Sequence, residues 1–195
     1  MTTTSAGSPT ITTIPPQQLE GVPLPETQTL FGRTFRRKGF GLRRFQWAGM
    51  QVRVYVAVRY EEEEGDQLFT FTFLRAFGEG RVRGAWSYQL ATSATDTDYE
   101  GWETDREAFI QLFGPIERMG TEQVLLRGNE TVVIDQGIQK GTIDGKEFQQ
   151  AFLSMWFGEK AVSEELKTGL MGLVCADNDM EETNQIVADQ ELQQL

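Results

Sequence analysis

Apolar and polar residues alternate strictly along residues 49–60. One set of alternate positions is almost wholly apolar: Met50, Val52, Val54, Val56, Val58 and Tyr60. A period of two places these side chains on one face of a β-strand, and we expect that face to be deeply buried. Residues 40–47 come directly before this strand, with Ala48-Gly49 between the two segments. The pattern therefore predicts a β-hairpin that turns at Ala48-Gly49.

The period changes further along the chain from that of a strand to that of a helix. Phenylalanines alternate with threonines over residues 69–73, which predicts another strand. Residues 80–94 then carry apolar side chains at helical spacing. A capping box formed by Thr104 and Glu107 predicts the start of a second helix, which Gly114-Pro115 interrupts.

The second half of the body repeats this order of strands followed by helices. Three short strands are predicted at residues 123–127, 131–135 and 138–143. Asp144 is a candidate N-cap for the next helix, Gly158 ends that helix, and Ser163 begins the last one. Strands and helices in separate runs are typical of an α+β fold and not of alternating βαβ units.

The ends of the chain differ in composition from the middle. Residues 1–29 are rich in Thr and Pro, and residues 176–195 are acidic and rich in Gln. Such segments bury too little apolar surface to offset the entropy of ordering, so we expect a disordered N-terminal tail and a mobile C-terminal one. One folded domain is predicted over residues 30–175.

Composition excludes several classes of chemistry. The sequence has no histidine, which removes histidine triads and histidine-bound metals, and Cys175 is its only cysteine. A net charge of −11 argues against a nucleic-acid reader and against attraction to an anionic membrane. No apolar run is long enough to span a bilayer, and no signal or transit peptide is readable, so a cytoplasmic location is expected by elimination. No metal or cofactor site is predicted.

Two blocks of the sequence together point to a known family. The first is Gly39-Phe40-Gly41-Leu42-Arg43, followed by the valine-rich strand; the second is the strand, aromatic helix and leucine helix of residues 137–173. In this order and spacing they resemble the chalcone isomerase-like family. The resemblance implies an open, mostly antiparallel sheet covered on one face by a helical layer, with a ligand cleft between the two.

Arg43 is the leading candidate for a functional residue. It shares its strand face with Phe45 and Trp47, and its guanidinium matches a carboxylate or enolate oxygen. The alternative reading is an exposed or acid-paired arginine. Gly41 either allows a ligand to approach the backbone or marks a strand irregularity. The resemblance implies that the arginine of this motif contacts the ligand, in enzymes and fatty-acid binders alike.

Other family positions differ from those of the plant isomerases. The threonine position falls on Tyr55, the tyrosine position falls near Trp86, and a further hydrogen-bonding position falls near Gln149. Tyrosine keeps a hydroxyl but fills more volume, and an indole can only donate. We therefore expect little flavanone-forming activity, because each lost acid, base or oxyanion partner typically costs a factor of about 100 or more.

These arguments lead to three functional hypotheses. The first is a non-catalytic binder of a fatty acid or similar amphipathic carboxylate, with Arg43 holding the head group and Tyr55 assisting; a monomer is favoured. The second is an intramolecular lyase acting on a chalcone or another enone through Arg43. The third is a ligand-free scaffold, whose cleft would be filled by its own Trp47, Tyr55 and Trp86.

Overall fold

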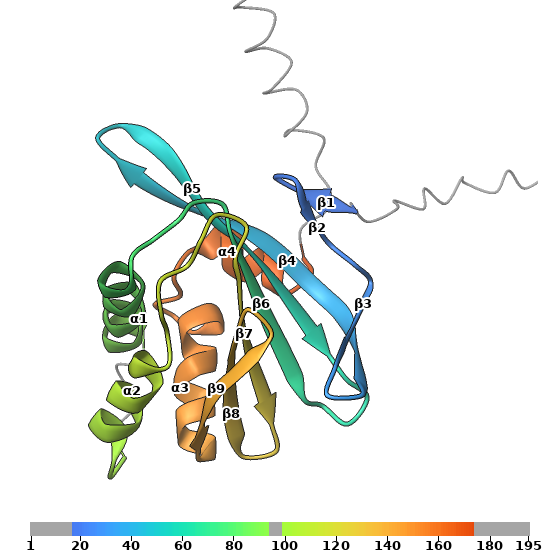
Figure 1. Cartoon of the computed structure of the whole chain (residues 1–195), viewed down its shortest axis with the longest axis vertical. Coiled ribbons are helices and arrows are strands. Elements are labelled where there is room, and N and C mark those ends of the chain that lie inside the picture. The colour runs from blue at the N-terminus through green and yellow to red at the C-terminus, as the bar shows by residue number, and fades with distance from the viewer. Residues whose placement is uncertain (1–16, 94–98, 174–195) are drawn as a thin grey trace, which may run out of the picture. The chain divides into compact units, whose positions relative to one another are not determined.

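The computed structural model describes residues 17–93 and 99–173. All elements described below belong to one compact unit, Gln18–Val174. The predictions made for residues 1–16 and 176–195 lie outside the described residues. Within the compact unit, the predicted α+β class is confirmed (Figure 1).

Seven strands form one antiparallel sheet in which every strand pairs with its neighbour in sequence. This order needs only hairpins and helical excursions, so no crossover is required. The strands are β3 (Thr27–Leu30), β4 (Arg33–Trp47), β5 (Met50–Glu61), β6 (Gln67–Phe73), β7 (Thr121–Arg127), β8 (Glu130–Asp135) and β9 (Ile138–Asp144). A separate two-stranded ribbon precedes them, made of β1 (Gln18–Leu19) and β2 (Val22–Pro23).

Four helices complete the unit, two after β6 and two after β9 (Figure 1). They are α1 (Glu79–Ser93), α2 (Trp102–Gln111), α3 (Lys146–Phe157) and α4 (Glu164–Leu170). Their apolar faces pack on one face of the sheet in a core dominated by aromatic rings. Phe69 and Phe71 of β6 meet Trp86 of α1 and Trp156 of α3 in this layer. We call the covered side the helix-covered face.

The opposite face of the sheet also carries a buried core. Val22 and Leu24 are 3% and 2% exposed and pack there with Phe35, Val56 and other strand residues. These two residues, and strands β1–β3, lie within the segment that composition had assigned to a disordered tail. That prediction was wrong for residues 18–29, because two apolar side chains and pairing with β4 suffice to order a segment that is otherwise polar.

The valine-rich strand is buried on both faces in its second half and on neither at its start. Val56 is fully buried, and so is Ala57 on the other face, whereas Met50 is 60% exposed. The prediction of a single deeply buried face was therefore only partly right. The predicted turn is confirmed: Ala48 and Gly49 both have positive φ, which suits a tight hairpin between β4 and β5.

Two predicted helix caps were wrong, and one is confirmed. Helix α2 begins at Trp102 after Gly101, two residues before Thr104, and has no side-chain cap. Asp144 ends β9, and Gly145 precedes α3. Ser163 does cap α4, because its hydroxyl accepts a hydrogen bond from the Leu166 N–H at 3.1 Å.

Candidate functional site

Arg43 and Tyr55 lie directly opposite each other on β4 and β5. A bulge follows immediately, because the next pair joins Arg44 to Arg53 and leaves Val54 unpaired in the ladder. The Arg43 guanidinium is half-buried and donates to the backbone carbonyl of Arg44 at 2.7 Å. Within residues 17–93 and 99–173, no carboxylate pairs with Arg43, so the acid-paired reading finds no support.

Tyr55 lies in an aromatic corner of the helix-covered face. Its ring is 5.6 Å from that of Phe71 and 5.5 Å from that of Phe73, in edge and tilted arrangements that favour aromatic contact. Burial raises the pKa of the Tyr55 hydroxyl well above its ordinary value, and the positive charge of Arg43 offsets part of that effect. Tyr55 is therefore a neutral hydroxyl beside a permanent cation.

Gly41 packs against helix α4. A Cβ at this position would lie 2.8 Å from a methyl carbon of Leu166 in α4. At Gly39 a Cβ would lie only 2.4 Å from the carbonyl oxygens of Gly169 and Leu170. The two glycines of the motif thus let α4 rest on β4, while Gly41 itself stays partly exposed, and its contact with a ligand stays a prediction.

Trp86 extends from α1 into the core of the helix-covered face, where it lies beside the acidic residue Glu122. Its indole N–H donates a hydrogen bond to the carboxyl group of Glu122 on β7. Burial, reinforced by the nearby negative charge of Asp135, raises the pKa of Glu122 to about 8, and the Trp86 bond opposes this only in part. Glu122 is therefore a neutral carboxylic acid near pH 7, placed on the far side of Tyr55 from Arg43.

Glu122 and Asp135 form a directly opposed pair on β7 and β8. They are 1% and 7% exposed, and each keeps one oxygen, Oε2 and Oδ1, without a hydrogen-bond partner in the described structure. The other Asp135 oxygen lies 3.4 Å from Lys140 Nζ. Sequence reasoning missed this pair, although the alternation with Val124 already places Glu122 on the apolar face.

Two of the hollows on the described surface lie away from Arg43 and Tyr55. One, of about 520 Å³, opens between β4 and the acidic loop after β5. The other, of about 300 Å³, is lined mainly by Leu153, Phe157 and Met171, with Arg59 and Lys167 nearby. Beside Arg43, the ring of Tyr55 packs against the aromatic core of the helix-covered face.

The fold agrees with comparisons to known proteins. A model of the chalcone isomerase-like family matches residues 16–172. This chain belongs to the chalcone isomerase-like family. A crystal structure of a fatty-acid binding protein from Arabidopsis thaliana matches with a TM-score of 0.66 and 14% identity, covering 77% of this chain and 92% of that one. No curated protein sequence matches the chain.

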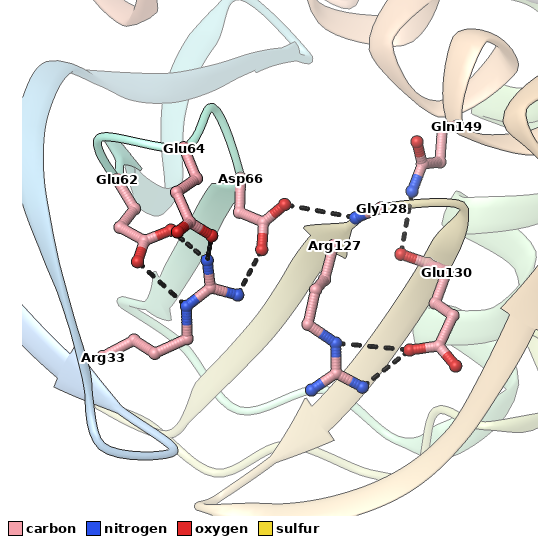
Figure 2. A network of polar contacts seen from close by, with 8 residues as sticks. All are labelled: Arg33, Glu62, Glu64, Asp66, Arg127, Gly128, Glu130 and Gln149. Carbon is pink, nitrogen blue, oxygen red and sulfur yellow. Dashed lines mark hydrogen bonds and ion pairs between the residues drawn. The ribbon is translucent and has the colours of Figure 1, made fainter.

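The family positions expected near the ligand are only partly brought together. Gln149 of α3 donates from Nε2 to the backbone carbonyl of Glu130 at 2.8 Å, and so ties the helix to the sheet (Figure 2). The same view shows Arg33, at the other end of β4 from Arg43, held by acidic side chains of the loop after β5. Five residues were predicted to contact a ligand. Among them, only Arg43 and Tyr55 lie side by side, and within the described residues neither has a hydrogen bond to another side chain.

The described residues also bear on metals and membranes. Across the two described ranges, no group of three or more acidic or cysteine side chains could hold a metal ion. In the same part of the chain, no helix is long and apolar enough to cross a membrane.

Proposed function

We propose that this chalcone isomerase-like protein is a non-catalytic binder of a fatty acid or similar amphipathic carboxylate. Arg43 receives the carboxylate, and Tyr55 donates a second hydrogen bond to it. The observation that carries this proposal is the direct pairing of Arg43 with Tyr55 on the helix-covered face, with no acid paired to the guanidinium within the described residues. The likeness to a fatty-acid binding protein supports the fold alone at 14% identity.

The chemistry of the pair favours a carboxylate over a neutral head group. An arginine is charged at every accessible pH, and the raised pKa of Tyr55 keeps its hydroxyl a donor. A charge-assisted hydrogen bond is worth roughly 1.5–3 kcal/mol. Each methylene that the aromatic layer buries adds about 0.8 kcal/mol, so the tail supplies most of the affinity and the pair sets its orientation.

Binding at this site requires the aromatic layer to open. Tyr55 packs on Phe71 and Phe73, and Phe71 in turn packs on Trp86, so a tail can enter only if these rings separate. We therefore expect an acyl chain to bind by displacing Tyr55 and its neighbours, and to quench or shift the tryptophan fluorescence of Trp86.

The direct test is titration calorimetry with a saturated fatty acid of medium chain length. Arg43→Ala is expected to weaken binding by about 10- to 100-fold, the equivalent of one charge-assisted hydrogen bond. Arg36→Ala is the matched control, because Arg36 lies on the same strand but is exposed. Equal affinity of the Arg43→Ala and Arg36→Ala variants would remove the proposed role of Arg43.

A second candidate function is that of a ligand-free scaffold. It is favoured by the filling of the sheet–helix layer by Tyr55 and Trp86, the mark expected for this reading. The side chain of Trp47, the third residue expected there, lies outside what the structure describes. A scaffold would bind no fatty acid, and it would unfold at the same temperature with or without one.

Lyase activity is supported least. Addition of a phenol oxygen to an enone needs donors at the carbonyl, and Trp86, at the family's tyrosine position, is already bonded to Glu122. A chalcone cyclisation assay with the Arg43→Ala variant as control separates this activity from the uncatalysed reaction.

A further inference from the structure

The hairpin formed by the end of β4 and the start of β5 extends past the other strands of the sheet (Figure 1). Of the four helices, α4 comes near the base of this hairpin, where Glu165 pairs with Arg44. Phe45 is 53% exposed and Met50 is 60% exposed on either side of the Ala48-Gly49 turn. Large apolar side chains at the end of a projecting arm are costly to leave in water and often mark an interaction surface.

The strand register makes this arm amphipathic. Phe45 pairs with Val52, and Met50 lies two residues before Val52 on β5, so three apolar side chains share one face. The alternate pairs, Gln46 with Gln51 and Arg44 with Arg53, occupy the opposite face. We call residues 44–53 the hairpin tip. Its two arginines lie three residue pairs back from the turn, about 10 Å along the ribbon.

Charge is distributed very unevenly around the hairpin tip. Residues 33–60 contain eight of the chain's 18 lysines and arginines and no acidic residue, although the whole chain has a net charge of −11. At physiological ionic strength charges are screened beyond about 8 Å. The hairpin tip carries Arg44 and Arg53 with their partners Glu165 and Glu20, so a surface that touches only the hairpin tip meets this local charge, and the net charge of the distant body matters little.

Both arginines of the hairpin tip have acidic partners that a phosphate could replace. Arg53 is 2.6 Å from Glu20, with 56% of its own side chain exposed, and Arg44 pairs with Glu165, which is 60% exposed. Ion pairs at exposed positions contribute little to stability. Exchanging a carboxylate for a phosphate oxygen therefore costs the fold little.

We propose that the hairpin tip docks the protein on the surface of a bilayer that contains anionic phospholipids. The apolar face enters the boundary between head groups and acyl chains, and Arg44 and Arg53 bind phosphates. The separation of about 10 Å between turn and arginines matches the depth of about 5–10 Å to which interfacial amphipathic segments sink. The net charge of −11 predicted repulsion from an anionic membrane, but that charge belongs to the whole chain, whereas the proposed contact involves the hairpin tip alone. The hairpin tip does not cross the bilayer. The proposal does not depend on fatty-acid binding.

Vesicle flotation tests the docking directly. The full chain is mixed with vesicles of phosphatidylcholine and phosphatidylserine, or of phosphatidylcholine alone. We expect binding to the anionic vesicles only, and a loss of about tenfold or more in the variant Phe45→Ser/Met50→Ser. Ile138→Ser is the matched control, because Ile138 is 64% exposed beside another hairpin turn, at Gln136-Gly137.

The arginines give an independent readout. Arg44→Gln and Arg53→Gln are each expected to weaken vesicle binding roughly fivefold and to reduce its dependence on salt. Circular dichroism of each variant checks that it is folded. The proposal is overturned if Phe45→Ser/Met50→Ser floats as well as the unchanged protein, or if Ile138→Ser loses as much binding.

Two other partners would also overturn it. If sedimentation shows a dimer that Phe45→Ser/Met50→Ser converts to a monomer, and vesicles do not bind, the hairpin tip is a contact between copies. If a single-stranded oligonucleotide binds the hairpin tip while vesicles do not, the basic and aromatic residues serve nucleic acid.

Discussion

At the scale of single residues, Arg43 shows what sequence could and could not predict. Its strand, its face and its place in the motif were all readable from the alternation of residues 40–60. Two alternatives stayed open, exposure or pairing with one of 29 acidic residues. The structure shows that Arg43 is half-buried opposite Tyr55. The sequence could not decide this, because a local pattern does not show which acidic residues from distant parts of the chain lie close to Arg43.

Glu122 illustrates the reverse case, a residue whose importance appears only in three dimensions. A glutamate in a strand reads as a solvent-facing side chain, and its burial depends on α1, which is more than 30 residues earlier in sequence. The partner Asp135 comes from the next strand. Their proximity therefore follows from register and helix packing, which the sequence pattern constrains only loosely.

Glu122 should make stability depend on pH in an unusual direction. Its pKa rises from 4.5 in the unfolded chain to about 8 in the fold, so the folded state binds the extra proton between these values. Stability is fully present below pH 4.5 and falls by up to about 1.4 kcal/mol per pH unit until the pH passes about 8. Urea denaturation across this range measures the slope.

The control variants for this prediction separate Glu122 from other acids. Glu122→Gln keeps the hydrogen bond from Trp86 but cannot ionise, so its slope over this range should be flatter. Glu117→Gln alters an exposed acid and should leave the slope unchanged. Parallel slopes for the unchanged protein and Glu122→Gln would contradict a protonated Glu122.

At the scale of elements, the periodicity of the chain predicted most strands and helices but not how they meet. The helix starts at Trp102 and Lys146 were missed, because glycines at 101 and 145 open these helices without side-chain caps. Gly41 was expected either to allow a ligand to approach the backbone or to mark a strand irregularity. The use of the motif's two glycines in packing α4 against β4 could not be predicted, since α4 is about 125 residues away in sequence.

The contact between β4 and α4 should be intolerant of one added methyl group. Gly39→Ala places a Cβ 2.4 Å from two backbone carbonyl oxygens, which cannot rotate away. We expect a loss of about 1–3 kcal/mol in the free energy of unfolding, as for other overpacked cores. Guanidinium denaturation provides the measurement.

Gly84→Ala is the matched control for that prediction. Gly84 lies within α1, and a Cβ there would meet nothing within 4 Å. Alanine is the better helix former, so this variant should gain about 0.5–1 kcal/mol. If Gly39→Ala were as stable as the unchanged protein, α4 would not rest on β4 as described.

At the scale of the whole molecule, the chalcone isomerase-like fold was predictable because its signals are spread over most of the chain. What composition concealed was local: an ordered N-terminal ribbon inside a Thr-rich segment, and a basic hairpin inside an acidic protein. The composition averaged over all 195 residues reveals neither the ordered ribbon nor the basic hairpin. The proposed ligand site and the hairpin tip share β4 and β5, so a bilayer under the tip would lie close to Arg43.

The central claim is that Arg43 and Tyr55 hold an amphipathic carboxylate. Native mass spectrometry of the protein purified from cells, followed by denaturing extraction, tests it most directly. We predict a mass increment that corresponds to a fatty acid, recovered in the extract and lost in Arg43→Ala but kept in Arg36→Ala. A protein that is empty as purified and stays empty after incubation with fatty acids would contradict the claim.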